Sequence, residues 1–295
     1  MHYCGGIETG FDKTIEAFNN MVLIGAGTYE EAYDVKIIDL DGKKIAFLAC
    51  CQYEFGIVDK ERGKRGAAWL MDPLVTEKIV EAKKSCDYLF VMPHAGLENC
   101  IYPLPEIREL YRHFINLGAD GVIASHPHIP QPIEIYKNHP IVYSLGNFCF
   151  DKLFDNLVLD YWQKGLCVTL VLGNEEIGVE KNYVSYNEAK KYVEINNNSQ
   201  DIIHLDNQLN ESLKDEQHYL DSINNICLNL QKQYENNLKT SGFFKFNLIA
   251  YLMICAKSMI RRKNYSNFSQ TSLINSIRCE THRWVLSRIY EINQL

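Results

Sequence analysis

Two histidine clusters, each placed directly after an apolar run, constrain the fold of this chain more than any other feature. The apolar runs are residues 87–92 and 119–124, and the clusters that follow them contain His94, His126 and His128. The segment between the two runs has the apolar spacing of an amphipathic helix. This order predicts a strand, a crossover helix and a second parallel strand. Both clusters would then lie at the carboxyl edge of the sheet, where ligands and catalytic groups of open α/β sheets gather.

Composition limits the class of protein. With 295 residues and 46% hydrophobic content, the chain can form one α/β domain with its own core and an extension. The net charge of −7 and the lack of a basic stripe argue against a nucleic-acid partner. The ten cysteines are scattered without a C-x-x-C pair, which favours free buried thiols over a zinc ribbon or a disulfide framework. We therefore expect a globular protein that does not bind nucleic acid.

The distribution of glycine and proline places a boundary near residue 195. All eight prolines lie between Pro73 and Pro140, and Gly242 is the only glycine after Gly178. The polar run 196–200 marks the change of composition and is typical of a linker. We predict two parts, a sheet domain over 1–190 and a helical extension over 200–295.

Local patterns predict the individual elements. In the first part we expect helices over 6–19, 72–84 and 105–117, and strands over 21–24, 35–40, 44–50, 131–136, 141–144, 166–172 and 179–186. Thr28 is expected to cap a short helix. In the second part, apolar residues recurring from Leu205 to Leu238 predict one long helix, and helices are expected over 243–261 and 269–292.

A series of short segments is distinctive as an ordered set. They are residue 2 with 10–17, then 25–27, 44–48, 94–98, 117–120, 126–128, 134–136 and 143–148. In this order and spacing the chain resembles the CapA (poly-γ-glutamate capsule synthesis) family, within the calcineurin-like metallophosphatase superfamily. The resemblance implies a calcineurin-like αββα sandwich with an appended α-helical C-terminal region. The family's first strand and its aspartate motif are missing, since Met1 stands where an asparagine is expected before His2.

The resemblance also implies roles for particular histidines. His94, His126 and His128 correspond to metal ligands, and His2 corresponds to a residue viewed as general acid or phosphate contact. The cofactor implied is a divalent metal ion, Mn, Fe or Zn, and imidazole ligands suit such metals. A bound divalent cation would lower the pKa of a water molecule and polarise a phosphate ester. Glu98 is a candidate to orient one of the histidines.

Three functional hypotheses follow. The first is a metal-dependent hydrolase of capsule or surface-polymer biosynthesis, with a small-molecule or polymer substrate. The second is a non-catalytic scaffold in polymer synthesis, with capsule-synthesis membrane proteins as partners, and the third is an inactive truncated member. The chain opens without a signal peptide, which predicts a cytoplasmic location, and cell surface or membrane association is the alternative if the N-terminus is truncated.

Overall fold

The fold was analysed in a computed structural model of the chain. The structure describes residues 8–18, 21–54, 56–150, 161–173, 176–187, 191–240 and 277–294. Two compact units are present, Met1–Tyr219 and Leu220–Leu295, and each is described here by itself. The expected boundary between 1–190 and 200–295 stays a prediction.

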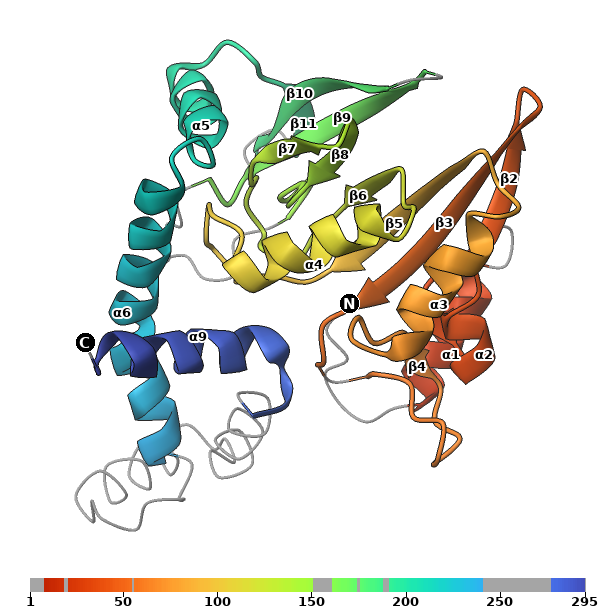
Figure 1. The fold of residues 1–295 in the computed structure, drawn as a ribbon, viewed down its shortest axis with the longest axis horizontal. Coiled ribbons are helices and arrows are strands. Elements are labelled where there is room, and N and C mark those ends of the chain that lie inside the picture. Colours follow the sequence, from red (N-terminus) through yellow and green to blue (C-terminus); the bar gives the residue numbers. More distant parts are fainter. Residues whose placement is uncertain are drawn as a thin grey trace. The chain divides into compact units, whose positions relative to one another are not determined.

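The core of the first unit is a six-stranded mixed sheet (Figure 1). Its strand order is β2-β3-β5-β6-β8-β7. The strands are β2 (Lys36–Leu40), β3 (Lys43–Cys51), β5 (Tyr88–His94), β6 (Gly121–Ile123), β8 (His139–Val142) and β7 (Ile133–Tyr136). The four inner strands pair in parallel, whereas the two edge strands pair antiparallel. The prediction of an α/β fold around a central sheet is confirmed.

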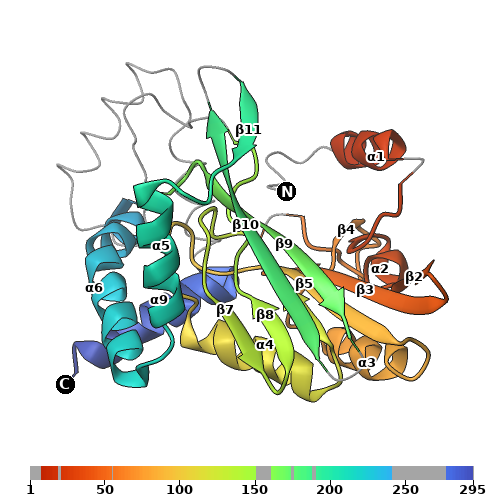
Figure 2. The ribbon, with the colours of Figure 1, turned by 90° about the horizontal axis from the view of Figure 1, so that it is seen from above.

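Two helices, α3 (Pro73–Ala82) and α4 (Pro105–Asn116), cover one face of this sheet (Figures 1 and 2). Helix α3 begins as its sequence predicts, with Asp72 accepting a hydrogen bond from the backbone of Leu74 at 2.9 Å and proline at the first helical position. Helix α4 connects β5 to β6, which confirms the strand, helix and strand order around the histidine clusters.

A smaller sheet covers part of the opposite face. It contains β9 (Lys164–Leu172), β10 (Ile177–Asn187) and β11 (Tyr192–Ile195), in the order β11-β10-β9. Leu170, Leu172 and Ile177 of this sheet pack with Ile45 and Phe90 of the larger one. The larger sheet is therefore enclosed between helices and a second sheet, as in other layered α/β domains.

A short peripheral region consists of residues before β2 and residues after β3. It contains α1 (Glu8–Ala17), β1 (Ala26–Gly27), α2 (Tyr29–Ala32) and β4 (Gly66–Ala67). The strand expected over 21–24 is wrong, because the short strand here is Ala26–Gly27, which pairs with β4. The capping role of Thr28 is confirmed, since its hydroxyl accepts from the backbone of Glu31 and the Glu31 carboxylate accepts from the backbone of Thr28.

The single helix expected from Leu205 to Leu238 is wrong. The structure has two helices, α5 (Gln200–Glu211) and α6 (Glu216–Thr240). Ser212 ends the first helix by donating its hydroxyl to the Leu209 carbonyl, and the Asp215 carboxylate accepts from the backbone of His218 at the start of the second. These side chains compete with the helical hydrogen bonds and separate the two segments. Helix α5 packs on Leu166 and Tyr183 of the smaller sheet.

The second unit contains most of α6 and the helix α9 (Glu280–Ile292). Asn293 donates to Gln231, and Tyr234 is hydrogen-bonded to His282, so the two helices are in contact. The helix expected over 243–261 lies outside the described residues. Among the helices that the structure describes, none is long and apolar enough to cross a membrane.

A nearly buried ion-pair network joins α4 to the edge of the large sheet. Glu134 of β7 accepts hydrogen bonds from Arg112 and from the Tyr143 hydroxyl (2.6 Å), and it also pairs with Arg108 at 3.5 Å. Burial raises the pKa of Glu134, but the hydrogen bonds from Arg112 and Tyr143 and the two guanidinium charges outweigh that effect, so the pKa lies below its ordinary value of 4.5.

We predict that Glu134→Gln lowers the free energy of unfolding by about 3 kcal/mol at neutral pH, because it leaves the nearly buried Arg112 pair without its carboxylate and Arg108 with Glu216 alone. A carboxyl with a lowered pKa in the folded state contributes stability above about pH 4.5, and this contribution is lost as the pH falls through the folded value. Urea unfolding of both proteins as a function of pH measures this difference. Glu109→Gln, an exposed change on α4, is the control. A difference that does not shrink in acid would contradict the assignment.

Candidate histidine site

The carboxyl ends of β5 and β6 position the predicted histidines. The backbone N–H of Ala95 donates to the carbonyl of Ser125 at 3.0 Å, and that of Ser125 donates to Pro93 at 3.0 Å. His94 and Ser125 are therefore directly opposite one another, as an isolated bridge between the strand ends. This pairing places the loop with His126 and His128 next to the end of β5.

The structure brings the three histidines of the central clusters together. The ring centroids of His94 and His126 are 4.9 Å apart in an edge-to-face arrangement, and those of His126 and His128 are 6.2 Å apart. His126 is 4% exposed, whereas the other two rings are half-buried. His2, the expected general acid, lies outside the described residues.

Two of the rings are oriented by hydrogen bonds at Nδ1. The Nδ1 atom of His94 is 2.9 Å from the Ser125 hydroxyl, and that of His128 is 2.9 Å from the side-chain oxygen of Asn147. The Asn147 amide nitrogen donates to the carbonyl of Trp162, so its oxygen must accept from His128. The Nδ1 atom of His128 therefore carries the proton. Hydrogen bonds of this kind orient histidines that bind metals through Nε2.

The ring of His126 contacts a buried amide instead. The backbone N–H of Gly96 donates to the Gln52 oxygen at 3.0 Å, which fixes the orientation of the amide. The Gln52 nitrogen then donates to Glu54 and lies 2.8 Å from Nε2 of His126. Because an amide nitrogen only donates, Nε2 must accept, and the neutral ring carries its proton on Nδ1. The Gln52 amide is thus hydrogen-bonded to Nε2 of His126, the nitrogen through which this ring would bind a metal ion.

Two carboxylates lie on the same side of His126. The Glu54 carboxylate is 3.7 Å and the Glu98 carboxylate 4.0 Å from Nε2 of His126. These separations exceed hydrogen-bond distance, so Glu98 does not orient this ring directly. The two acidic side chains make this end of the sheet favourable for a positively charged ligand.

The loops that carry the histidines have unusual backbone conformations. His126 and His128 have φ angles of 113° and 65°, in a region that residues other than glycine rarely adopt. Gly96 has a φ of 135°, and a side chain there would meet the Pro127 ring at 3.0 Å. Strained backbone of this kind persists where the surrounding structure holds it, and it concentrates at functional sites.

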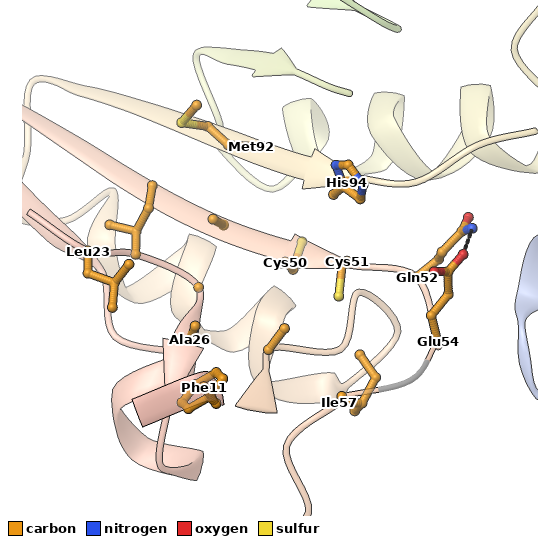
Figure 3. A pocket seen from close by; sticks show the side chains of 15 residues that line it. Phe11, Leu23, Ala26, Cys50, Cys51, Gln52, Glu54, Ile57, Met92 and His94 are labelled. Carbon is orange, nitrogen blue, oxygen red and sulfur yellow. Dashed lines mark hydrogen bonds between the residues drawn. The ribbon is translucent and has the colours of Figure 1, made fainter. Parts of the chain in front are cut away.

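A pocket of about 270 Å³ opens beside His94 (Figure 3). Its polar end is formed by His94, Gln52 and Glu54, and its remaining lining is apolar, including Leu23 and Met92. A mostly apolar lining with a few polar groups at one end is typical of small-molecule sites.

The chemistry of the donors fits a divalent metal, but their arrangement here does not complete a ligand set. Three neutral imidazoles with oriented neighbours are suitable ligands for Zn or Fe. Within the described ranges, however, no group of three or more His, Cys, Asp or Glu side chains is placed to hold an ion. Gln52 accounts for this in part, because its amide is hydrogen-bonded to His126. The metal role of the three histidines stays a prediction.

Sequence reasoning missed Gln52 and Glu54 as parts of the site. Both follow β3, which ends at the same edge of the sheet as β5. Their position directly after the expected strand over 44–50 could have identified them, because that strand ends beside the first histidine cluster. Asn147 lies in the segment 143–148 of the family resemblance, and the structure assigns it the contact with His128.

Comparisons with known proteins identify the family of this chain. The family described as "Bacterial capsule synthesis protein PGA_cap" matches residues 2–152. The "PGA biosynthesis protein CapA" of Bacillus subtilis (strain 168) is 45% identical over 74 residues, 25% of this chain and 20% of that protein. The "Capsule biosynthesis protein CapA" of Bacillus anthracis is 30% identical over 150 residues, 48% of this chain and 36% of that protein. The chain thus spans only about a fifth and about a third of the length of these two relatives.

A solved structure of a putative 5′-nucleotidase from Staphylococcus aureus is similar at 16% identity and a TM-score of 0.34, covering 66% of this chain and 38% of that one. The family match extends over more than half of the 295 residues and includes all three histidines of the site. The chain is an α/β protein with a histidine site at the carboxyl edge of its sheet. It belongs to the PGA_cap family of bacterial capsule synthesis proteins, which confirms the resemblance to CapA.

We predict that Asn147→Ala lowers the free energy of unfolding by about 1–3 kcal/mol, because it removes a buried hydrogen-bond partner of both His128 and Trp162. Thermal unfolding measures the loss, and NMR of the labelled His128 ring is expected to show a changed tautomer ratio. Asn116→Ala, at an exposed position of α4, is the control. An unchanged His128 spectrum would contradict the proposed orientation.

Proposed function

We propose that this chain is a metal-dependent phosphoester hydrolase in the biosynthesis of a capsule or another surface polymer. The observation that carries the proposal is the convergence of His94, His126 and His128 at one sheet edge, with ring centroids 4.9 and 6.2 Å apart. Membership of a capsule synthesis family supports the biological setting. The names of the Bacillus relatives support poly-γ-glutamate as the polymer.

The three imidazoles are the proposed ligands of a divalent ion. His94 and His128 bind through Nε2, because Ser125 and Asn147 engage their Nδ1 atoms. His126 would hold the ion through Nε2, the nitrogen that the Gln52 amide contacts in this structure. A bound divalent ion lowers the pKa of its water and polarises a phosphoryl oxygen. His2 is the proposed general acid, as the family resemblance implies.

The residues around the ligands perform the other tasks of such a site. His126 is buried, so bulk water would be excluded from its side of an ion, which would strengthen electrostatic interactions there. Glu54 and Glu98 add negative charge that favours retention of a cation. The apolar part of the pocket accepts the non-phosphate part of a substrate.

A second function, a non-catalytic partner in polymer synthesis, is favoured by one specific observation. Gln52 is hydrogen-bonded to Nε2 of His126 and to Glu54, and its oxygen accepts from Gly96. This satisfied network stabilises the site without any ion. In that case the histidines would have a structural role, and capsule-synthesis membrane proteins are the proposed partners.

Metal titration separates the two functions. We expect the purified chain to bind one Mn²⁺ or Zn²⁺ ion, measured by isothermal titration calorimetry, and His126→Ala to abolish that binding. Gln52→Ala is expected to tighten binding about fivefold, because a hydrogen bond of about 1 kcal/mol no longer competes with the ion. His113→Ala, on the exposed side of α4, is the control and leaves binding unchanged.

Hydrolysis of p-nitrophenyl phosphate by the metal-loaded chain measures the activity directly. Loss of turnover in His126→Ala together with retention in His113→Ala supports the hydrolase. Absence of metal binding in both the parent chain and Gln52→Ala would exclude the hydrolase and leave the non-catalytic function.

A further inference from the structure

A short hairpin beside the pocket concentrates positive charge in a chain that is acidic as a whole. This basic hairpin, residues 59–65, contains the basic side chains Lys60, Arg62, Lys64 and Arg65. Over 60–65 they are accompanied by one carboxylate, which gives a net charge of +3, whereas the net charge of the chain is −7. A local concentration of one charge sign attracts ligands of the opposite sign.

Backbone hydrogen bonds give the basic hairpin a defined conformation. Asp59 and Lys64 exchange both of their backbone hydrogen bonds, at 3.0 and 2.9 Å. The Asp59 carboxylate accepts from the backbone of Arg62 at 3.1 Å, and Gly63 supplies the positive φ of 61° that the turn requires. The basic side chains therefore project from an ordered turn, and little backbone entropy has to be lost when a ligand binds them.

The basic hairpin begins at the wall of the pocket and precedes β4 (Figure 1). The wall includes Gly56, Ile57 and Ala67. The backbone of Ala67 donates to Gly56 at 2.8 Å and accepts from Val58 at 3.0 Å, which holds the two sides of the hairpin together at the pocket. Arg65 precedes Ala67 by two residues, a distance of at most about 7 Å. A ligand in the pocket can therefore reach the basic side chains.

The two ends of the pocket carry opposite charge. The Arg65 guanidinium lies over the ring of Phe11, 5.5 Å from its centroid, and Phe11 lines the pocket. Figure 3 shows Phe11 across the pocket from His94. At the His94 end, Glu54 supplies negative charge. A substrate with carboxylates is therefore oriented with these groups toward the hairpin and away from Glu54.

The ion pairs within reach of the basic hairpin are exposed or long, so a carboxylate of a ligand can compete with them. Arg62 is 3.5 Å from Asp59 with 84% of its side chain exposed, and Arg65 is 4.0 Å from Glu31. Exposed pairs of this kind contribute little to stability. A guanidinium can instead donate two parallel hydrogen bonds to one carboxylate, which is a stronger interaction.

The lining of the pocket favours a chain of amino acids over a nucleic acid as the source of the anionic groups. Single-stranded nucleic acids bind by stacking their bases on aromatic rings. Among the described residues that line the pocket, Phe11 is the only Phe, Tyr or Trp, and Arg65 lies over its ring. Leu23 and Ile57 give the wall an aliphatic surface, which suits the methylene groups of acidic amino acids.

We propose that the basic hairpin binds the carboxylates of an acidic polymer of amino acids, and that Lys60, Arg62 and Arg65 select substrates of this class. The inference rests on the proposed function, because that function assigns the pocket to the substrate. It adds a specificity determinant outside the histidine site, at the end of the pocket opposite His94.

Binding of hexaglutamate to the metal-free chain tests the proposal separately from hydrolysis. By calorimetry we expect binding that weakens as salt is added, and no binding of the uncharged hexaglutamine. Lys60→Gln combined with Arg62→Gln is expected to weaken the binding at least about fivefold, because two cations that contact the ligand are lost. Lys84→Gln combined with Lys214→Gln is the matched control, since it removes the same charge at exposed positions elsewhere and leaves binding nearly unchanged.

Both double variants should have the melting temperature of the parent chain, because all four side chains are exposed. The proposal is overturned if the parent chain does not bind hexaglutamate, or if both double variants bind it equally well. Equally tight binding of an oligothymidylate of the same charge would also overturn it. Hexaglutamate binding that the hairpin variant loses supports the proposal even if the metal-loaded chain shows no turnover, and turnover without such binding overturns this inference alone.

Discussion

The parallel pairing of β5 with β6 is the constraint on which the site depends. It is fixed at both ends of the strands. At the start of β5, the Asp120 carboxylate accepts from the backbone of Leu89 at 2.7 Å and from Lys83 at 2.6 Å. At the other end, backbone bonds hold Ser125 opposite His94. A shift of one residue in this register would move His94 to the other face of the sheet. The imidazoles lie close together because these hydrogen bonds fix the register of β5 and β6.

Apolar periodicity was sufficient to predict this part of the fold. The strands around the histidine clusters and the helix between them have clear patterns, and Asp72 and Pro73 mark the start of α3. Parallel strands with a short crossover helix are adjacent in most α/β folds, so the histidines could be expected at one edge. The prediction needed only local patterns and a general rule of chain topology.

The rest of the site depends on contacts that no local pattern encodes. Gln52 is a single polar residue after a strand, and its importance comes from Gly96 and His126, which are distant in the sequence. The φ of 113° at His126 is imposed by its loop, since residues other than glycine rarely adopt it. The break between α5 and α6 was missed for a related reason, because the apolar spacing continues through it while Ser212 interrupts the backbone bonds.

The buried amide of Gln52 connects the two proposed functions physically. It is 3% exposed and contacts a backbone group, a carboxylate and an imidazole, so its removal from His126 must be compensated by a stronger interaction. A divalent cation can supply that interaction, because a metal–imidazole bond is stronger than a neutral hydrogen bond. Glu54, released from the amide, would then face the cation with a full negative charge. The same residues thus form a hydrogen-bonded network without an ion and would hold a cation once the amide moves, and the energy of moving one side chain separates the two states.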